Sequence, residues 1–352
     1  MALRDLSLSD WAHMGDEMAR GECEAIAQAL PHGATFNGLK AHAYCGREYR
    51  IARFRLGDGE EAAEFVLVPG GEASVGFDGR EFRPSEQQLE SFARSAEEYC
   101  IDQSIREFVN AQTSAPRVVY IAAMLVEVEA REIGVEQVGP DDPAYSELCR
   151  QLHQLQGKGP TRMEYAGGHL DGCYVIERNA DGTYRAWRRR LTTSAEVETA
   201  LAAQGMRLPT CDEWERACGA GATTLFRWGD DTPADFYPGE ASAEDRQQLT
   251  AWALSGGRLP YSRPPAVWDI HERPNLFGLR IAMNPYHVDL VADGPRALGG
   301  DGGCNICGGA GFFLGWLPLA TAFREPSVGS WSAPDANVAD GYCSVRRVIS
   351  IP

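Results

Sequence analysis

The sequence predicts an irregular α+β fold in which short helices and antiparallel strands are joined by long loops. A helix is expected where Thr210 and Glu213 have the spacing of a capping box, with Gly219 at its end. Residues 49–55 alternate between apolar and polar side chains, which predicts a strand. Residues 232–274 contain no periodic segment and are expected to form a long loop-rich region.

Length and charge limit the classes of function. The 352 residues are enough for one large domain or two ordinary ones, and 44% of them are hydrophobic, which suffices for a packed core. A net charge of −17 argues against nucleic acid and anionic membrane as main partners. The sequence has no run of about 18 apolar residues, and its N-terminus lacks the apolar core of a secretory signal. We therefore expect a cytoplasmic protein whose partner is a peptide, a small molecule or a protein ligand.

The first 62 residues are predicted to form a helix and hairpin extension. Residues 9–30 carry one helical apolar face, and Pro31 ends it. Residues 36–56 follow as two strands around a Cys-Gly-Arg turn. We place a boundary near residue 62, so that residues 63–352 form the main domain.

The main domain is expected to alternate between helices and strands. Residues 84–109 have helical spacing of their apolar side chains, and residues 117–133 are typical of a central strand and its neighbour. We further expect a helix at 145–155, strands within 167–190 and a helix at 194–204.

The segment Met206–Asp231, with R-L-P-T-x-x-E-W-E followed by R-W-G-D, resembles the formylglycine-generating enzyme family, also called the sulfatase-modifying factor family. Four further motifs occur in the order that the family has them: Phe65–Gly71, Asn275–Leu279, Leu298–Gly300 and Gly341-Tyr342. The resemblance spans residues 63–352. It implies a C-type-lectin-like fold with little regular secondary structure.

Two of the ten cysteines are candidates for chemistry. In the resembling enzymes, a cysteine pair after G-G-S binds one copper(I) ion, which activates oxygen to oxidise a substrate cysteine to formylglycine. Cys304 matches the first of that pair, because it lies three residues after Asp301, which stands in place of the family's serine. Cys307 follows with C-x2-C spacing where the family has C-x4-C. The resemblance thus implies a catalytic set of Cys304, Cys307 and Asp301 with copper as cofactor.

Other interpretations of the pair stay open. Thiolates are soft donors that suit copper(I) or zinc, and a zinc site would need two more ligands, for which Cys343 and His287 are candidates. The pair can also be a disulfide or two buried thiols. Asp301 beside the pair is expected to raise the pKa of a thiol and to repel an anionic substrate. The remaining eight cysteines, scattered without metal spacing, are expected to be mostly reduced core thiols.

The resemblance also implies structural calcium, bound by loop carboxylates and carbonyls. Asp235 and Asp289 are the candidate ligands by position. The segment 283–290 departs from the family pattern M-x-G-N-x-W-E-W, because Gly-Asn is replaced by Pro-Tyr and both tryptophans are missing. The alternative is that both aspartates are solvated loop carboxylates.

Two functions follow from these observations. The first is a metal-dependent oxidase that acts through Cys304 and Cys307 on a cysteine or related group. The second is a non-catalytic C-type-lectin-like module, since the fold tolerates variable loops and a site can be lost without loss of the fold. In that case the contact face would be residues 301–340, whose aromatic side chains can equally be core: Phe312, Phe313, Trp316 and Trp331. Arg324 matches a recurring family arginine whose expected role is structural.

Overall fold

A computed structural model describes most of the chain. The described residues are 3–30, 33–57, 62–154, 162–166, 173–179, 181–238, 268–294, 297–324, 335–338 and 341–352. Among the helices of these residues, none is long and apolar enough to cross a membrane.

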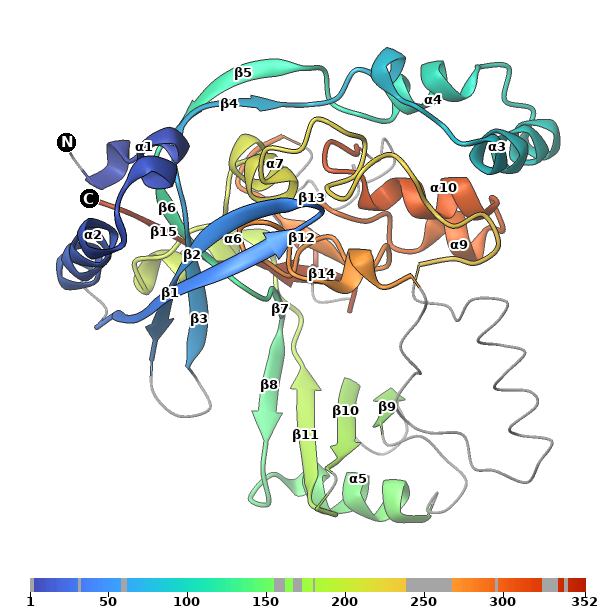
Figure 1. Cartoon of the computed structure of the whole chain (residues 1–352). Coiled ribbons are helices and arrows are strands. Elements are labelled where there is room, and N and C mark those ends of the chain that lie inside the picture. Colours follow the sequence, from blue (N-terminus) through green and yellow to red (C-terminus); the bar gives the residue numbers. More distant parts are fainter. Residues whose placement is uncertain are drawn as a thin grey trace.

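The largest sheet joins the N-terminal hairpin to the main body (Figure 1). Its antiparallel order is β1 (Thr35–Tyr44), β2 (Arg47–Leu56), β3 (Ala63–Val68), β6 (Met124–Glu127) and β15 (Val348–Ser350). Cys45 and Gly46 turn the hairpin with positive φ angles of 50° and 74°. The strands predicted within residues 36–56 are confirmed, and β2 pairs directly with β3 beyond residue 62.

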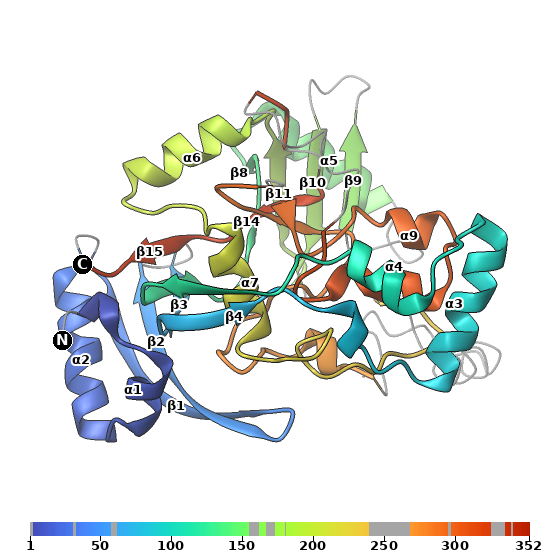
Figure 2. The same ribbon diagram turned by 90° about the horizontal axis from the view of Figure 1, so that it is seen from above.

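Two helices cover one end of this sheet, α1 (Leu8–His13) and α2 (Asp16–Ala29) (Figures 1 and 2). The sequence predicts one helix over 9–30, whereas the structure breaks it at Met14 and Gly15, which have extended backbone angles. Trp11 is buried and donates its indole N–H to the Arg50 carbonyl at 2.9 Å, while the Arg50 guanidinium lies over the Trp11 ring. These contacts anchor the helices to β2.

A second sheet lies in the centre of the body. Its order is β13 (Ala297–Leu298), β12 (Val288–Leu290), β14 (Cys343–Val345) and β7 (Arg131–Glu132). The β12–β14 pair is parallel and the other two pairs are antiparallel. This short sheet brings together segments that are up to about two hundred residues apart in the chain.

A lobe with its own hydrophobic core lies below the body in Figure 1. It contains a four-stranded sheet with the order β8 (Val135–Val138), β11 (Tyr184–Arg189), β10 (Cys173–Arg178) and β9 (Arg162–Ala166). Helix α5 (Pro143–Gln154) packs Leu148 and Leu152 against this sheet, which confirms the helix predicted at 145–155. The run 117–133 is divided among β5 (Arg117–Ile121), β6 and β7, which lie in three different sheets.

The end opposite to α1 and α2 is helical (Figure 2). Helices α3 (Glu86–Tyr99) and α4 (Ile105–Ala111) lie in the chain between β4 (Gly71–Val75) and β5, which pair with each other as an antiparallel ribbon. Helix α10 (Phe312–Trp316) packs on α3, and Phe82 and Phe313 stack with ring centroids 5.6 Å apart. Short 3-10 turns complete the described elements: η1 (Leu3–Asp5), η3 (Gly79–Glu81), η4 (Ile270–Glu272) and η5 (Leu317–Leu319).

The capping box predicted at Thr210 is confirmed. The Thr210 hydroxyl accepts from the Glu213 N–H at 3.2 Å, and the Glu213 carboxylate accepts from the Thr210 N–H at 2.8 Å. Helix α7 (Cys211–Gly219) then buries Trp214 and Ala217, and Ala220 rather than a glycine takes the left-handed cap position. The preceding helix, α6 (Ser194–Ala203), agrees with the predicted segment 194–204.

Candidate functional site

The two candidate thiols lie on one helical turn, α9 (Cys304–Cys307). Both side chains are exposed and neither forms a disulfide. Residues at i and i+3 of a helix lie on the same face, so the two sulfurs share one side of the turn. Gly303 precedes the turn with φ +80°, and a Cβ atom there would lie 2.1 Å from the Tyr286 ring, so this position requires glycine.

Asp301 lies beneath the turn. Its side chain is buried, with one carboxylate oxygen accepting from the Gly303 N–H at 2.8 Å and the other from the Asn305 N–H at 3.0 Å. Both bonds fix the backbone that carries the cysteines. The carboxylate therefore acts on the thiols through the conformation of the loop.

Two tyrosines brace the turn from other parts of the chain. The Tyr286 hydroxyl lies 3.5 Å from the Cys307 sulfur, and the Tyr99 hydroxyl donates to the Gly308 carbonyl at 2.6 Å. Tyr99 ends α3, more than two hundred residues before the turn. Sequence analysis missed both residues, because tyrosine carries no ligand spacing of its own and the contacts are long-range.

The donor set fits copper(I) better than zinc. The exposed thiols of Cys304 and Cys307 are of the soft donor type that copper(I) prefers. Structural zinc takes four ligands, and the described residues contain no cluster of three or more His, Cys, Asp and Glu arranged to hold a metal. Cys343, a zinc candidate from the sequence, is buried in β14.

The two calcium candidates differ in burial. Asp235 is exposed, whereas Asp289 is only 8% exposed. One oxygen of Asp289 accepts from the Trp214 indole N–H at 3.0 Å and from the Arg346 guanidinium at 2.8 Å. Calcium takes six to eight oxygen ligands, and the described residues contain no cluster of three or more His, Cys, Asp and Glu that could hold a metal, so these residues do not fit a calcium site. The alternative of a solvated loop carboxylate is also wrong for Asp289.

The other eight cysteines differ in burial. Four of them are buried as predicted, Cys149 is half-buried, and the prediction of core thiols is wrong for the three that are exposed: Cys45, Cys100 and Cys173. Cys45 lies at the hairpin turn and Cys100 at the left-handed cap of α3, where the backbone faces solvent.

The aromatic side chains of the predicted contact face are largely core. Phe313 is 1% exposed and Trp316 is fully buried, and the Trp316 indole donates to the Phe236 carbonyl at 3.0 Å. Phe312 is half-buried against Tyr237. Trp331 lies outside the described residues. The aromatic contact face is therefore wrong for Phe313 and Trp316.

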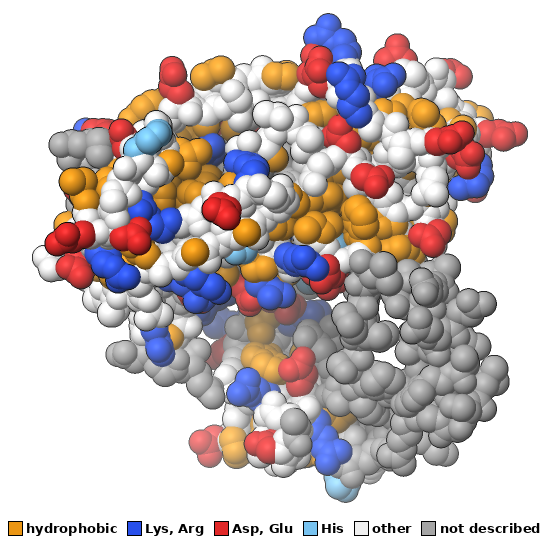
Figure 3. Space-filling view, in the orientation of Figure 1, with side chains coloured by type: hydrophobic (Ala, Val, Ile, Leu, Met, Phe, Trp, Pro, Cys, Tyr) orange, Lys and Arg blue, Asp and Glu red, His pale blue; other side chains and the backbone are white. Residues whose placement is uncertain are grey.

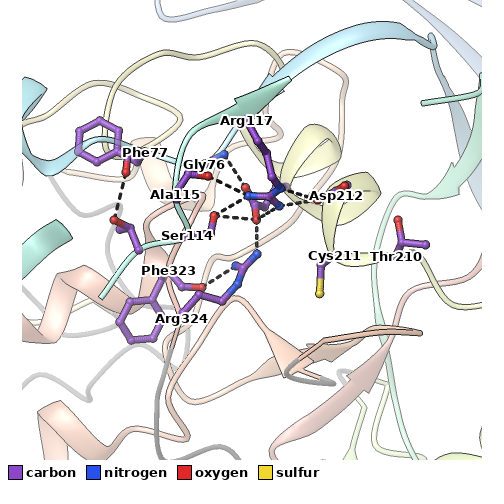
Figure 4. Close-up of polar contacts among 12 residues, drawn as sticks. Gly76, Phe77, Ser114, Ala115, Arg117, Thr210, Cys211, Asp212, Phe323 and Arg324 are labelled. Carbon is purple, nitrogen blue, oxygen red and sulfur yellow. Dashed lines mark hydrogen bonds and ion pairs between the residues drawn. The ribbon is translucent and has the colours of Figure 1, made fainter. Parts of the chain in front are cut away.

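A buried carboxylate organises the centre of the body. Glu215, on α7, is 4% exposed. Its Oε1 accepts from the Ser114 hydroxyl at 3.0 Å, from Arg117 at 2.9 Å and from Arg324, and its Oε2 accepts from the Gly76 N–H at 2.7 Å. Figure 4 shows Arg117 and Arg324 reaching this point from opposite sides. The structural role predicted for Arg324 agrees with these contacts.

Comparison with known proteins identifies the class to which this fold belongs. The family model described as "Sulfatase-modifying factor enzyme 1-like domain" matches residues 55–255, which is more than half of the chain. The chain therefore belongs to the sulfatase-modifying factor family and has its C-type-lectin-like α+β fold. No curated protein matches the sequence. The matched residues include α7 and Glu215 and end before the cysteine turn.

Proposed function

We propose that Cys304 and Cys307 hold one copper(I) ion as thiolates, and that the chain is an oxygen-dependent oxidase acting on a cysteine or related group of a peptide or small metabolite. The observation that supports the proposal is the presence of two exposed cysteines, neither in a disulfide, on one helical turn. The resemblance of the sequence implies that this turn corresponds to the family's cysteine pair. Their exposure leaves room for a peptide chain to reach them.

The reaction balances with an external thiol as reductant. The substrate CH2–SH group and one O2, with two electrons and two protons from two reductant thiols, give an aldehyde, hydrogen sulfide and water. The carbon–sulfur bond of the substrate breaks, a carbon–oxygen double bond forms, and the reductant becomes a disulfide. Bound copper(I) would supply the activation of oxygen.

The chain's own residues hold the reactive turn. Asp301 fixes the backbone N–H groups of Gly303 and Asn305, and Tyr286 keeps its hydroxyl beside the Cys307 sulfur. Such positioning limits the freedom of the two thiols before a ligand arrives, which lowers the entropic cost of binding.

The alternative is a non-catalytic ligand- or protein-binding module. The shorter C-x2-C spacing and Asp301 in the place of serine favour it, since both change the immediate surroundings of the thiols. An assay for catalysis separates the two functions, because a binding module retains its fold without any turnover.

Metal reconstitution tests the proposal. The full chain is reduced, loaded with copper(I) without oxygen, and its metal content is measured together with that of Cys304→Ser and Cys307→Ser. Cys173→Ser is the matched control, because this exposed cysteine lies in the lobe. We expect one copper per chain in the wild type and the control, and its loss in both turn variants. Equal copper in all four proteins would contradict the proposal.

The proposed oxidase activity is tested by a separate assay. The loaded protein is incubated with a cysteine-containing peptide, oxygen and an external thiol, and aldehyde and sulfide are quantified. Equal amounts of both products are expected. Copper binding without either product would leave the binding module as the function.

A further inference from the structure

A polar cleft opens above the central four-stranded sheet, apart from the exposed face of the cysteine turn. It encloses about 380 Å³, which lies within the range of small-molecule sites, about 300 to 1,000 Å³. Its floor is one row of paired residues across the sheet: Leu298, Asp289, Ser344 and Glu132. Paired residues of neighbouring strands project from the same face, so the four side chains point the same way. Figure 3 shows acidic and basic side chains together where the body meets the lobe.

The floor offers acceptors to a ligand. Both hydrogen bonds of Asp289, from Trp214 and Arg346, fall on the same oxygen, Oδ2. The second oxygen, Oδ1, accepts no hydrogen bond from the described part of the chain and belongs to a residue that lines the cleft. The neighbouring Ser344 is also 8% exposed, and its hydroxyl makes no hydrogen bond to the residues that the structure describes. A carboxylate oxygen beside a hydroxyl suits an ammonium group.

The wall offers donors. Arg280 lines the cleft and is paired through its Nε with Glu129 at 3.1 Å. Its two terminal nitrogens make no hydrogen bond within the described ranges, and its side chain is 43% exposed. The Arg280 carbonyl accepts from the Arg346 guanidinium at 2.9 Å, which places Arg280 next to the Arg346–Asp289 pair. A guanidinium with free terminal N–H groups is suited to bind a carboxylate.

We propose that this cleft binds a free α-amino acid. The ligand ammonium donates to Asp289 Oδ1 and to the Ser344 hydroxyl oxygen, and the ligand carboxylate accepts from the terminal nitrogens of Arg280. Trp214 and Leu298, which are buried, also line the cleft. Recognition of both charges distinguishes an amino acid from a simple amine or acid, because each of these leaves one protein group without its partner. This site is independent of the proposed copper chemistry.

Calorimetry on the full chain tests the proposal. The twenty standard L-α-amino acids are titrated one at a time, up to about 10 mM, so that even millimolar affinities are detected. Each amino acid that binds is compared with the amine that lacks its carboxylate and with the acid that lacks its ammonium. The variants are Arg280→Gln and Ser344→Ala, and Arg83→Gln is the matched control because Arg83 is 71% exposed in a surface pair with Glu81. Both cleft variants are chosen to keep the buried Asp289–Arg346 pair intact.

We expect saturable binding of at least one amino acid, weakened about tenfold or more in Arg280→Gln and in the carboxylate-free amine, since a charged hydrogen bond is lost in each. Arg83→Gln and Cys304→Ser should bind as the wild type does. The absence of binding for every amino acid would overturn the proposal. So would an affinity that Arg280→Gln leaves unchanged, or an amine that binds as tightly as its parent amino acid. None of these outcomes bears on copper binding by the cysteine turn, so the two proposals fail independently.

Discussion

Replacement of Glu215 by glutamine is expected to destabilise the whole domain. The carboxylate is 2% exposed in its side chain and accepts from two guanidiniums, a hydroxyl and a backbone N–H. The amide keeps the shape but removes the charge, and it turns one acceptor into a donor that faces N–H groups. Breaking a buried ion pair by removing one partner costs about 3–5 kcal/mol.

The lower part of that range applies here. The side chains of Arg117 and Arg324 are 32% and 20% exposed, so water partly solvates them after the change. Arg117 also keeps its ion pair with Asp212. We therefore expect a loss of about 3 kcal/mol in the free energy of unfolding. The unfolding entropy is about 2.1 cal/mol/K per residue, so for the 352 residues of this chain a loss of about 3 kcal/mol lowers Tm by roughly 4 °C.

Thermal and urea unfolding measure this loss. Glu81→Gln is the matched control, because Glu81 is 69% exposed in a long surface pair with Arg83, and such a change is worth about 0.5 kcal/mol or less. If Glu215→Gln unfolds within about 1 kcal/mol of the wild type, the carboxylate does not organise the centre of the body as its contacts indicate. A loss of copper binding without a loss of stability would also refute this structural role.

Three further results are expected. Thr210→Ala removes the cap of α7 and should lower the free energy of unfolding by about 1 kcal/mol in urea denaturation; an unchanged midpoint would show that the cap is dispensable. Burial raises the pKa of the Cys218 thiol from 9.0 to about 12, so the unfolded chain loses this proton first as pH rises. The contribution of this thiol to the free energy of unfolding is therefore full below about pH 9 and decreases toward pH 12. Cys218→Ala should make the free energy of unfolding fall less steeply over this pH range, and an equal fall in both proteins would contradict the prediction. A thiol reagent should rapidly label the five exposed cysteines of the native protein: Cys45, Cys100, Cys173, Cys304 and Cys307. Slow labelling of any of them would contradict its exposure in the structure.

Features that depend on neighbouring residues were predictable from the sequence, whereas contacts between residues far apart in the chain were not. The capping box at Thr210 depends on residues three apart, so its spacing alone predicts it. The contacts of Asp289 depend on Trp214 and Arg346, which are 75 and 57 residues away. No spacing rule connects such distant residues, and a loop aspartate therefore looked like a calcium ligand or a solvated carboxylate.

The cysteine turn illustrates the same limit. Its sequence indicates a thiol pair, yet the burial of Asp301 and the approach of Tyr286 are set by how distant loops pack. The burial of the other cysteines also depends on tertiary packing. Cys45 and Cys100 lie at turns that the folded chain leaves exposed, which their sequence positions do not indicate.

The motifs that carry the family resemblance hold loops together. Asn275 is fully buried and satisfies its amide completely: its oxygen accepts from two N–H groups of its own turn, and its nitrogen donates to the carbonyls of Ala217 and Cys218 at the end of α7. Glu215 likewise joins α7 to Gly76 and Arg324. In a fold with few long strands or helices, such side chains replace the hydrogen bonds that regular elements would supply.

This division of roles explains what the family membership establishes. Trp214, Glu215 and Asn275 of these motifs are buried and hydrogen-bonded, so they serve the fold whatever the protein does. The residues available to a ligand lie elsewhere, on the exposed cysteine turn and in the polar cleft. The matched segment 55–255 therefore identifies the scaffold, whereas Cys304, Cys307, Arg280 and Ser344, which belong to the two proposed sites, lie beyond it. Cys304→Ser, Cys307→Ser, Arg280→Gln and Ser344→Ala are expected to change binding without unfolding the protein, whereas Glu215→Gln is expected to lower its stability.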